Sequence, residues 1–166
     1  MKMKSLKTLA LAGAVTASTF LAGGVAFAQE VTLKMHQFLP AQANVPKLVL
    51  DVWAKDVEEA SGGRIKVEHY PSMQLGGTPP QLMDQAIDGT VDVIWTVVGY
   101  TPGRFPRVEV FELPFMMTNA DATSRAYWDL FDKEMKDTDF KDVHIIGTWV
   151  HGPGMIHSSK PVSGLA

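Results

Sequence analysis

The chain has 166 residues, of which 46% are hydrophobic and 20% are charged, and this is the composition of an ordinary soluble protein. Its net charge of −3 argues against a nucleic-acid partner or an anionic membrane surface. It has no cysteine, so a disulfide framework is excluded and stability must come from a buried core.

Residues 1–28 have the pattern of a cleaved export signal. Three lysines precede an uncharged apolar run at 9–25, and Ala26-Phe27-Ala28 matches an A-x-A cleavage site. The run is short and interrupted by glycines, which argues against a membrane anchor. We therefore expect cleavage after Ala28 and a mature protein in the periplasm. Loss of the three lysines would change the net charge from −3 to −6.

The first elements of the mature chain predict a βαβ unit. Strands are expected at 31–37 and 65–70, joined by a helix that Asn44 caps and that tolerates Pro46 in its first turn. Ser61-Gly62-Gly63 is expected to end this helix. The residues on its apolar face, which we expect to point into the core, are Val45, Leu48, Val49, Val52, Trp53 and Val57.

The next segment predicts a second helix followed by a buried strand. Thr78-Pro79 has the pattern of a cap and first helical residue, and Asp88-Gly89 stops the helix. Residues 91–98 are β-branched and almost wholly apolar, so we expect a strand covered on both faces. The irregular loop at 99–106 follows its carboxyl end, where ligands bind in open α/β sheets. An ordinary surface loop is the alternative.

A third helix and a fourth strand complete the pattern. Asn119 or Asp121 begins the helix, and the strand is expected at 143–150. The apolar residues that we expect to face inward from the helix are Ala122, Ala126, Tyr127, Leu130 and Phe131. Alternation of strands and helices predicts the α/β fold class, with a mostly parallel sheet and helices on both faces.

Motifs of catalysis are missing from the sequence. It contains no nucleophile elbow, phosphate-binding loop, dinucleotide fingerprint or zinc motif, and its five histidines show no pair at ligand spacing. We therefore predict neither a metal nor a cofactor. Asp92 is the nearest candidate for a general base, but its place after a turn favours a backbone-capping role. Trp95, Tyr100 and Phe105 either line a site or fill a core.

Several short motifs in a fixed order carry a family resemblance. The chain resembles the solute-binding proteins of tripartite ATP-independent periplasmic (TRAP) transporters, from about Val31 to its end. The matching motifs are Gly62-Gly63-Arg64-Ile65-Lys66-Val67, Tyr70-Pro71, Gln74-Leu75-Gly76, Ile87-Asp88-Gly89-Thr90-Val91-Asp92 and Glu112-Leu113-Pro114-Phe115.

The resemblance implies a two-domain, type II periplasmic-binding-protein fold. Residues 29–150 would form the first α/β domain, and 151–166 would cross toward a second domain that this chain lacks. An arginine that pairs with the ligand carboxylate in the family would then lie beyond Ala166. The implied function is that of a monomeric extracytoplasmic receptor. It would bind a small organic acid without turnover and deliver it to a membrane permease.

The resemblance also implies which residues contact the ligand, at the ends of three strands and in one loop. These candidates are Gln37, Phe38, Leu39, Thr78, Trp95, Thr96, Val97, His151 and Gly154. Sialic-acid receptors of the family carry a charged or polar residue where Val97 stands and an arginine near Gly154. The departures at both positions argue against a heavily hydroxylated sugar acid and favour a smaller or more apolar carboxylate, including an aromatic one.

Two other functions are compatible with the sequence. One is an exported α/β enzyme with His151 or Asp92 as the base. The other is a receptor for an ABC-type importer, which uses a related two-domain fold. Turnover of a candidate acid would identify the enzyme, and the neighbouring membrane-component genes would distinguish the two transporter types.

Overall fold

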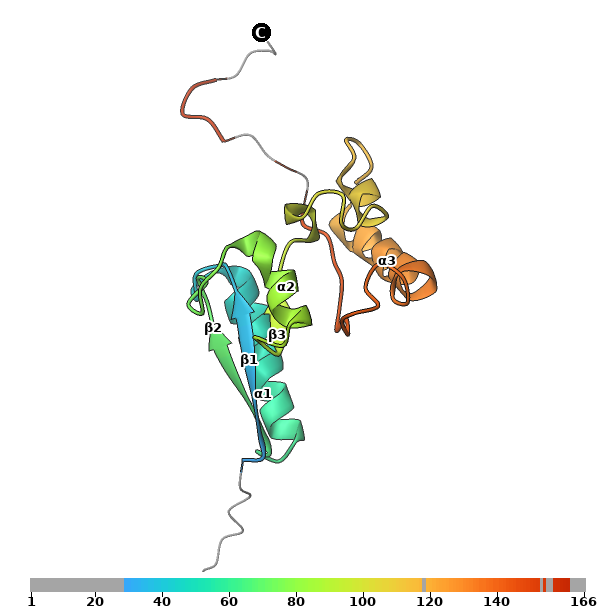
Figure 1. Ribbon diagram of the computed structural model, residues 1–166. Coiled ribbons are helices and arrows are strands. Elements are labelled where there is room, and N and C mark those ends of the chain that lie inside the picture. Colours follow the sequence, from blue (N-terminus) through green and yellow to red (C-terminus); the bar gives the residue numbers. More distant parts are fainter. Residues whose placement is uncertain (1–28, 118, 153, 155–156, 162–166) are drawn as a thin grey trace, which may run out of the picture.

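The computed structural model describes residues 29–117, 119–152, 154 and 157–161. The expected signal at 1–28 lies outside these residues, as do parts of the expected crossover at 151–166. Figure 1 shows a sheet with helices packed against it and, farther along the chain, a group of short helices around α3. Among the described residues, no helix is long and apolar enough to cross a membrane.

The sheet is parallel, as expected, and the first strand lies at its centre. In the described residues the order is β2-β1-β3, formed by β2 (Ile65–Tyr70), β1 (Val31–Gln37) and β3 (Val93–Trp95). In β1, Met35 is the position that aligns with His69 of β2 and with Val93 of β3. All three strands therefore end at one edge of the sheet, where their carboxyl ends meet.

The first helical segment covers one face of the sheet. A π-helical turn, η1 (Pro46–Leu50), leads into α1 (Asp51–Ala60), and Pro46 stands in the first turn as expected. The segment begins without a side-chain cap, so the capping role expected of Asn44 is not found. Buried residues from the helix and from the sheet form one core cluster, namely Met35, Leu50, Ala54 and Val67.

The apolar face of this segment is only partly buried, which corrects the expectation. Trp53 and Val57 pack against the cluster, but Leu48, Val49 and Val52 are exposed, Leu48 to 63%. The π-helical turn is the physical reason. A π-helical turn holds more residues than the 3.6 of an α-helical turn, so each residue advances by a smaller angle and the apolar stripe shifts between η1 and α1.

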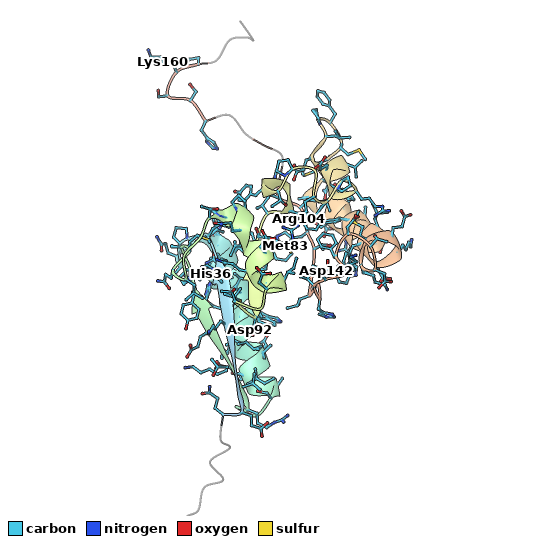
Figure 2. The ribbon with its side chains drawn as sticks, viewed as in Figure 1. His36, Met83, Asp92, Arg104, Asp142 and Lys160 are labelled. Atoms are coloured by element: carbon cyan, nitrogen blue, oxygen red, sulfur yellow. The ribbon has the colours of Figure 1, made fainter. Side chains whose placement is uncertain are left out.

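The second helical segment covers the opposite face of the sheet. It consists of η2 (Pro79–Gln81) and α2 (Leu82–Ile87), with Thr78 as the cap. His36, the neighbour of Met35 in β1, points to this face (Figure 2), and its Nδ1 lies 2.8 Å from Gln85 Oε1. Because successive side chains of a strand point to opposite faces, helices cover both faces of this sheet, as predicted.

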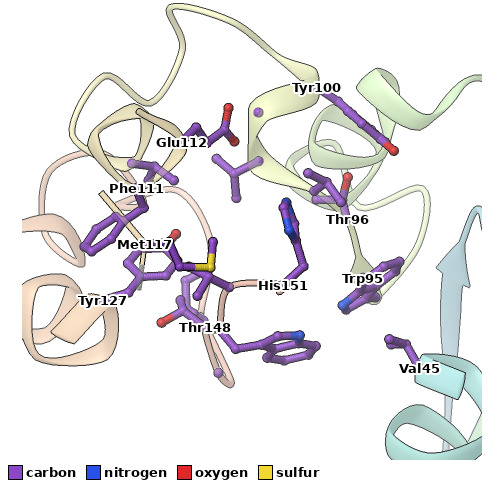
Figure 3. Close-up of a pocket in the computed structure, with 18 of the residues that line it drawn as sticks. Val45, Trp95, Thr96, Tyr100, Phe111, Glu112, Met117, Tyr127, Thr148 and His151 are labelled. Atoms are coloured by element: carbon purple, nitrogen blue, oxygen red, sulfur yellow. The ribbon is translucent and has the colours of Figure 1, made fainter. Parts of the chain in front are cut away.

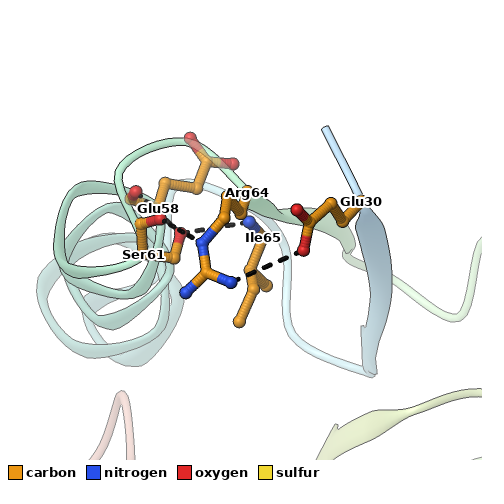
Figure 4. A network of polar contacts seen from close by, with 5 residues as sticks. All are labelled: Glu30, Glu58, Ser61, Arg64 and Ile65. Carbon is orange, nitrogen blue, oxygen red and sulfur yellow. Dashed lines mark hydrogen bonds and ion pairs between the residues drawn. The ribbon is translucent and has the colours of Figure 1, made fainter. Parts of the chain in front are cut away.

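A polar network fixes the turn between α1 and β2. Gly62 and Gly63 end the helix with φ values of 64° and 80°, in the left-handed region that favours glycine. Ser61 Oγ donates to Glu58 O at 2.9 Å and accepts from Ile65 N at 3.0 Å. Arg64 reaches Glu30 Oε2 at 3.5 Å, just before β1 (Figure 4). The glycine-arginine motif thus sets where β2 starts beside β1.

The third strand is shorter and less buried than expected. The prediction of a fully covered strand at 91–98 is wrong, because β3 comprises only Val93–Trp95 and these residues are half-buried. A strand lasts only as long as a neighbour offers backbone partners. Trp95 aligns with Gln37, the last residue of β1, and Val98 begins the short helix η3 (Val98–Tyr100).

A second core cluster lies beyond β3. It is formed mainly by η4 (Val108–Glu112), α3 (Ala120–Leu130) and η5 (Phe131–Met135), with Met83 of α2 and two loop phenylalanines. Asn119 caps α3 by accepting from Ala122 N at 3.0 Å. Tyr127 and Phe131 are buried, whereas Ala122 and Ala126 are exposed, so the alanines expected to face inward do not. The buried members are Met83, Phe105, Val108, Phe111, Tyr127, Phe131, Met135 and Phe140.

The fourth strand is not formed. Residues 143–150 are described but contain no strand, so that prediction is wrong. Val143, Ile145 and Val150 instead pack against the second cluster, and Val150 N donates to Ser124 Oγ of α3 at 3.0 Å. The apolar residues of this segment are therefore partly buried against helices. In the described residues the segment has no strand as a backbone partner.

Candidate ligand-binding site

A cavity of about 800 Å³ lies beyond the carboxyl end of β3 (Figure 3). Its walls come from the end of β3, the helices η3, η4 and α3, and the extended segment after Val143. Most of the lining is apolar or aromatic, the usual lining of a small-molecule site. The lining residues include Ile94, Trp95, Thr96, Val97, Val98, Tyr100, Phe111, Glu112, Met117, Tyr127, Phe140, Thr148, Trp149, Val150 and His151.

Three aromatic rings stand together on one side of this cavity. The rings of Phe38 and Trp95 are stacked, with centroids 5.1 Å apart, and the centroid of Tyr100 lies 5.4 Å from that of Phe38. Trp95 and Tyr100 line the cavity, and Phe38 supports Trp95 from outside it. The stack presents a rigid apolar surface at low entropic cost, which suits the flat face of an aromatic ligand.

The charged groups around the cavity are unevenly distributed. Glu112 lines it, whereas no lysine or arginine is among its described lining residues. Arg104 is paired with Asp84 at 2.7 Å, and Arg107 with Asp139 at 2.9 Å. These two arginines are thus held at the surface by acids, outside the cavity.

The carboxylate of Glu112 lies directly over Gly99. A Cβ atom at position 99 would collide with both of its oxygens. Only glycine leaves this space to the acid, which explains a glycine at a position where the chain does not adopt a left-handed conformation. This arrangement places the negative charge at the wall of the cavity.

Two hydroxyl groups at the cavity are buried and lack a hydrogen-bond partner among the described residues. They are Tyr127 Oη and Thr148 Oγ1. The Tyr127 side chain is 4% exposed, and its burial, together with the nearby Glu112 and Asp139 carboxylates, raises its pKa to about 12. The phenol therefore keeps its proton at neutral pH and remains a hydrogen-bond donor.

Of the nine candidate residues, five line the cavity. They are Trp95, Thr96, Val97, His151 and Gly154. His151 lies in the middle of the view in Figure 3, and its Nδ1 lies 2.6 Å from Gly152 O, which leaves Nε2 for another partner. The structure thus brings the ends of the third strand and the start of the expected crossover to one site.

The other four candidates have different positions. Phe38 belongs to the aromatic stack, Gln37 and Leu39 flank it in the sequence, and Thr78 donates from its backbone N to Gln81 Oε1 at 2.8 Å as a helix cap. None of the four is among the lining residues of the cavity. Phe38 alone reaches the site indirectly, through Trp95.

Gln37 belongs to a buried polar chain that fixes the end of β1. Its Nε2 donates to Leu39 O at 2.9 Å and its Oε1 accepts from Leu39 N, and these two bonds set the orientation of the amide. The same Nε2 lies 3.1 Å from His69 Nε2, so that ring nitrogen must accept. His69 Nδ1 then carries the proton and donates to Asp51 Oδ1 at 2.6 Å.

Two titratable residues outside the cavity, Asp92 and His36, have structural roles. Asp92 Oδ2 accepts from Lys34 N at 2.8 Å, which confirms the backbone-capping interpretation. His36 is fully buried and accepts from Leu75 N through Nε2 at 3.3 Å while its Nδ1 faces Gln85. Both groups tie β1 to the segments beside it, and neither lines the cavity.

Glu112, Tyr127 and Thr148 line the cavity but carried no signal of ligand binding in the sequence. Only Tyr127 stood where burial is predicted, on the expected inner face of its helix. Tyr127 and Thr148 line the same cavity because residues 143–150 pack beside α3, and the strand prediction did not anticipate this packing.

Comparison with known proteins identifies the class of protein. The model of the bacterial extracellular solute-binding proteins, family 7, matches residues 36–166. This chain belongs to that family, which confirms the resemblance to TRAP solute-binding proteins and the α/β fold class.

Two solved structures are especially similar. A TRAP solute-binding protein from Rhodoferax ferrireducens T118, in complex with copurified benzoate, is 58% identical, with a TM-score of 0.70 over 74% of this chain and 38% of that one. A marine metagenome TRAP protein specific for aromatic acids, in complex with metahydroxyphenylacetate, is 51% identical. Its TM-score is 0.72 over 75% of this chain and 39% of that one.

A curated relative is more distant. The sialic acid-binding periplasmic protein SiaP of Vibrio cholerae serotype O1 is 25% identical over 97% of this chain and 46% of its own length. The chain thus spans less than half the length of these relatives.

Proposed function

We propose that this protein is an extracytoplasmic receptor that binds a small aromatic carboxylate and delivers it to a TRAP-type permease. The observation that carries the proposal is the stacked wall of Phe38, Trp95 and Tyr100 beside an apolar cavity at the carboxyl edge of a parallel sheet. Relatives that are 58% and 51% identical bind benzoate and metahydroxyphenylacetate, and their similarity supports the same ligand class here.

The ligand carboxylate needs a cationic partner. Such a group outweighs the cost of desolvating the anion, and a bidentate arginine is the best match to its geometry. We propose that this arginine comes from the second domain implied by the resemblance. His151 is a second candidate within the described cavity, because its Nε2 is not engaged by the contact to Gly152.

The receptor is expected to act in the periplasm, as a monomer, and without chemical turnover. Residues 1–28 supply the export signal, and cleavage after Ala28 gives a mature start at Gln29. The side chains around the cavity support binding without catalysis. Glu112 has no second acid among the described lining residues with which to form a carboxylate pair.

A thermal-shift screen of the full-length gene product tests the ligand class. Benzoate and mandelate should raise the melting temperature, and succinate and N-acetylneuraminate should have little effect. At 100 times its dissociation constant, a ligand stabilises the folded state by about 2.7 kcal/mol. Stabilisation by succinate or by neutral sugars alone would contradict the proposal.

Two further measurements separate the receptor from the alternatives. Incubation with benzoate followed by chromatography should recover all of the acid, whereas an enzyme would deplete it. The neighbouring genes should encode two membrane components and no ATPase, since an ABC importer requires an ATPase. Recovery of a converted product would instead establish an enzyme.

A further inference from the structure

The two unpartnered hydroxyl groups belong to two segments that one hydrogen bond holds together. Val150 N donates to Ser124 Oγ at 3.0 Å, which holds the segment before His151 along α3. Tyr127 stands three residues after Ser124, on the same face of the helix, and Thr148 stands two residues before Val150. Figure 3 accordingly shows Tyr127 and Thr148 on one side of the cavity and Trp95 on the other.

Both hydroxyls have an unmet need for a hydrogen bond. A buried polar group without a partner is costly, and most such groups in native proteins are satisfied by protein, water or a ligand. Neither Tyr127 Oη nor Thr148 Oγ1 has a partner in the described part of the chain, and both residues line the same cavity. Tyr127 cannot turn to solvent, because its ring is packed against Phe111 with centroids 4.8 Å apart.

The charge around these hydroxyls determines what kind of group they can bind. Burial, and after it the nearby Glu112 and Asp139 carboxylates, raise the pKa of the Tyr127 phenol, which therefore stays protonated. The same negative field repels the carboxylate of a ligand. A neutral hydroxyl is the better occupant, since it can accept from one of the two side chains and donate to the other.

We propose that Tyr127 and Thr148 form a subsite for a hydroxyl substituent on the ligand ring, at the end of the cavity away from Trp95. This inference rests on the proposed function, since it assumes that an aromatic acid occupies the cavity. The ring would lie along the aromatic stack, with its carboxylate directed away from Glu112. The receptor would then prefer a hydroxylated aromatic acid to the unsubstituted acid, because a buried polar site discriminates against ligands that leave it unpaired.

Calorimetry on the full-length gene product tests this subsite, with benzoate and its 2-, 3- and 4-hydroxy isomers as probes. At least one hydroxy isomer should bind about 3- to 10-fold more tightly than benzoate, the range expected for one neutral hydrogen bond. Tyr127→Phe and Thr148→Val should each reduce this ratio toward 1, and the ratio, measured within each variant, is the readout. Tyr70→Phe is the matched control, because its hydroxyl bonds Glu68 at the sheet edge, and it should leave the ratio unchanged.

Each other outcome has a definite meaning. If benzoate binds at least as tightly as all three isomers, or if both variants keep the wild-type ratio, the subsite is wrong and the proposed function stands. If no aromatic acid binds the wild-type protein, the proposed function fails and the subsite with it. Should Tyr127→Phe not fold, Thr148→Val alone decides, because the Thr148 side chain is not part of either core cluster.

Discussion

The indole ring of Trp95 lies on the phenyl ring of Phe38, with their planes inclined by 28°. One ring comes from the end of β3 and the other follows β1, so the contact joins the carboxyl ends of two paired strands. Trp95 faces the cavity and Phe38 does not. The pair therefore connects the core of the sheet to the wall of the site.

Replacing Trp95 by alanine should weaken binding of benzoate by roughly 1–3 kcal/mol, because the flat wall for the ligand ring is lost. Calorimetry of the folded fraction measures this effect. Trp128→Ala is the control, because Trp128 lies on α3, is 41% exposed and is not a lining residue. Lower stability with unchanged affinity in Trp95→Ala would mean that the ring serves only the core.

The Glu112 charge should oppose binding of an anion. We expect Glu112→Gln to tighten benzoate binding by about 0.5–1 kcal/mol, with the gain shrinking in high salt. Gly99→Ala should have a similar effect, since its Cβ displaces the same carboxylate, and the double variant should add little to either change. Gly152→Ala, where a Cβ meets no atom within 4 Å and which does not line the cavity, is the control. Additive effects would contradict this account.

The buried amide of Gln37 should be more important for stability than for direct ligand contact. Gln37→Leu leaves His69 Nε2 without its donor, and we expect a loss of about 1–3 kcal/mol in the free energy of unfolding. Urea denaturation measures it. Gln74→Leu, at an exposed position, should stay within about 0.5 kcal/mol of the wild type. Equal stability of the two variants would show that the network contributes nothing.

Alkaline pH should destabilise the protein through Tyr127. A tyrosine in the unfolded chain loses its proton near pH 10, whereas burial raises the folded pKa of Tyr127 to about 12. The stability that this group contributes is therefore complete below pH 10 and is lost as pH rises toward 12. The loss should reach about 1.4 kcal/mol per pH unit in this window. Urea titrations of wild type and Tyr127→Phe at pH 9 and pH 11 should diverge accordingly, and parallel curves would argue against a buried phenol.

Local patterns were sufficient for much of the fold. The alternating strand at 31–37, the glycine stop after α1 and the caps at Thr78 and Asn119 all depend on nearby residues, and each is found in the structure. The motifs of the resemblance supplied the family, which local patterns alone did not.

The errors concern features that depend on distant partners. Residues 143–150 have strand propensity, yet they pack on α3 because no strand pairs with them in the described residues. The family resemblance predicted that Thr78 contacts the ligand, but in the structure its backbone N caps η2 by donating to Gln81. The sequence could not place Tyr127 and Thr148 at one cavity, because that placement depends on the Val150–Ser124 contact.

The central position of β1 governs the order in which the sheet can form. Val31 pairs with a residue 34 positions later, Ile65, and Met35 pairs with Val93, 58 positions later. The earliest strand to leave the ribosome is thus the last to have both edges occupied, and such distant pairings slow the search for the native topology. The sheet therefore cannot be complete until Trp95 has been synthesised. Such a delay would suit the export that residues 1–28 predict.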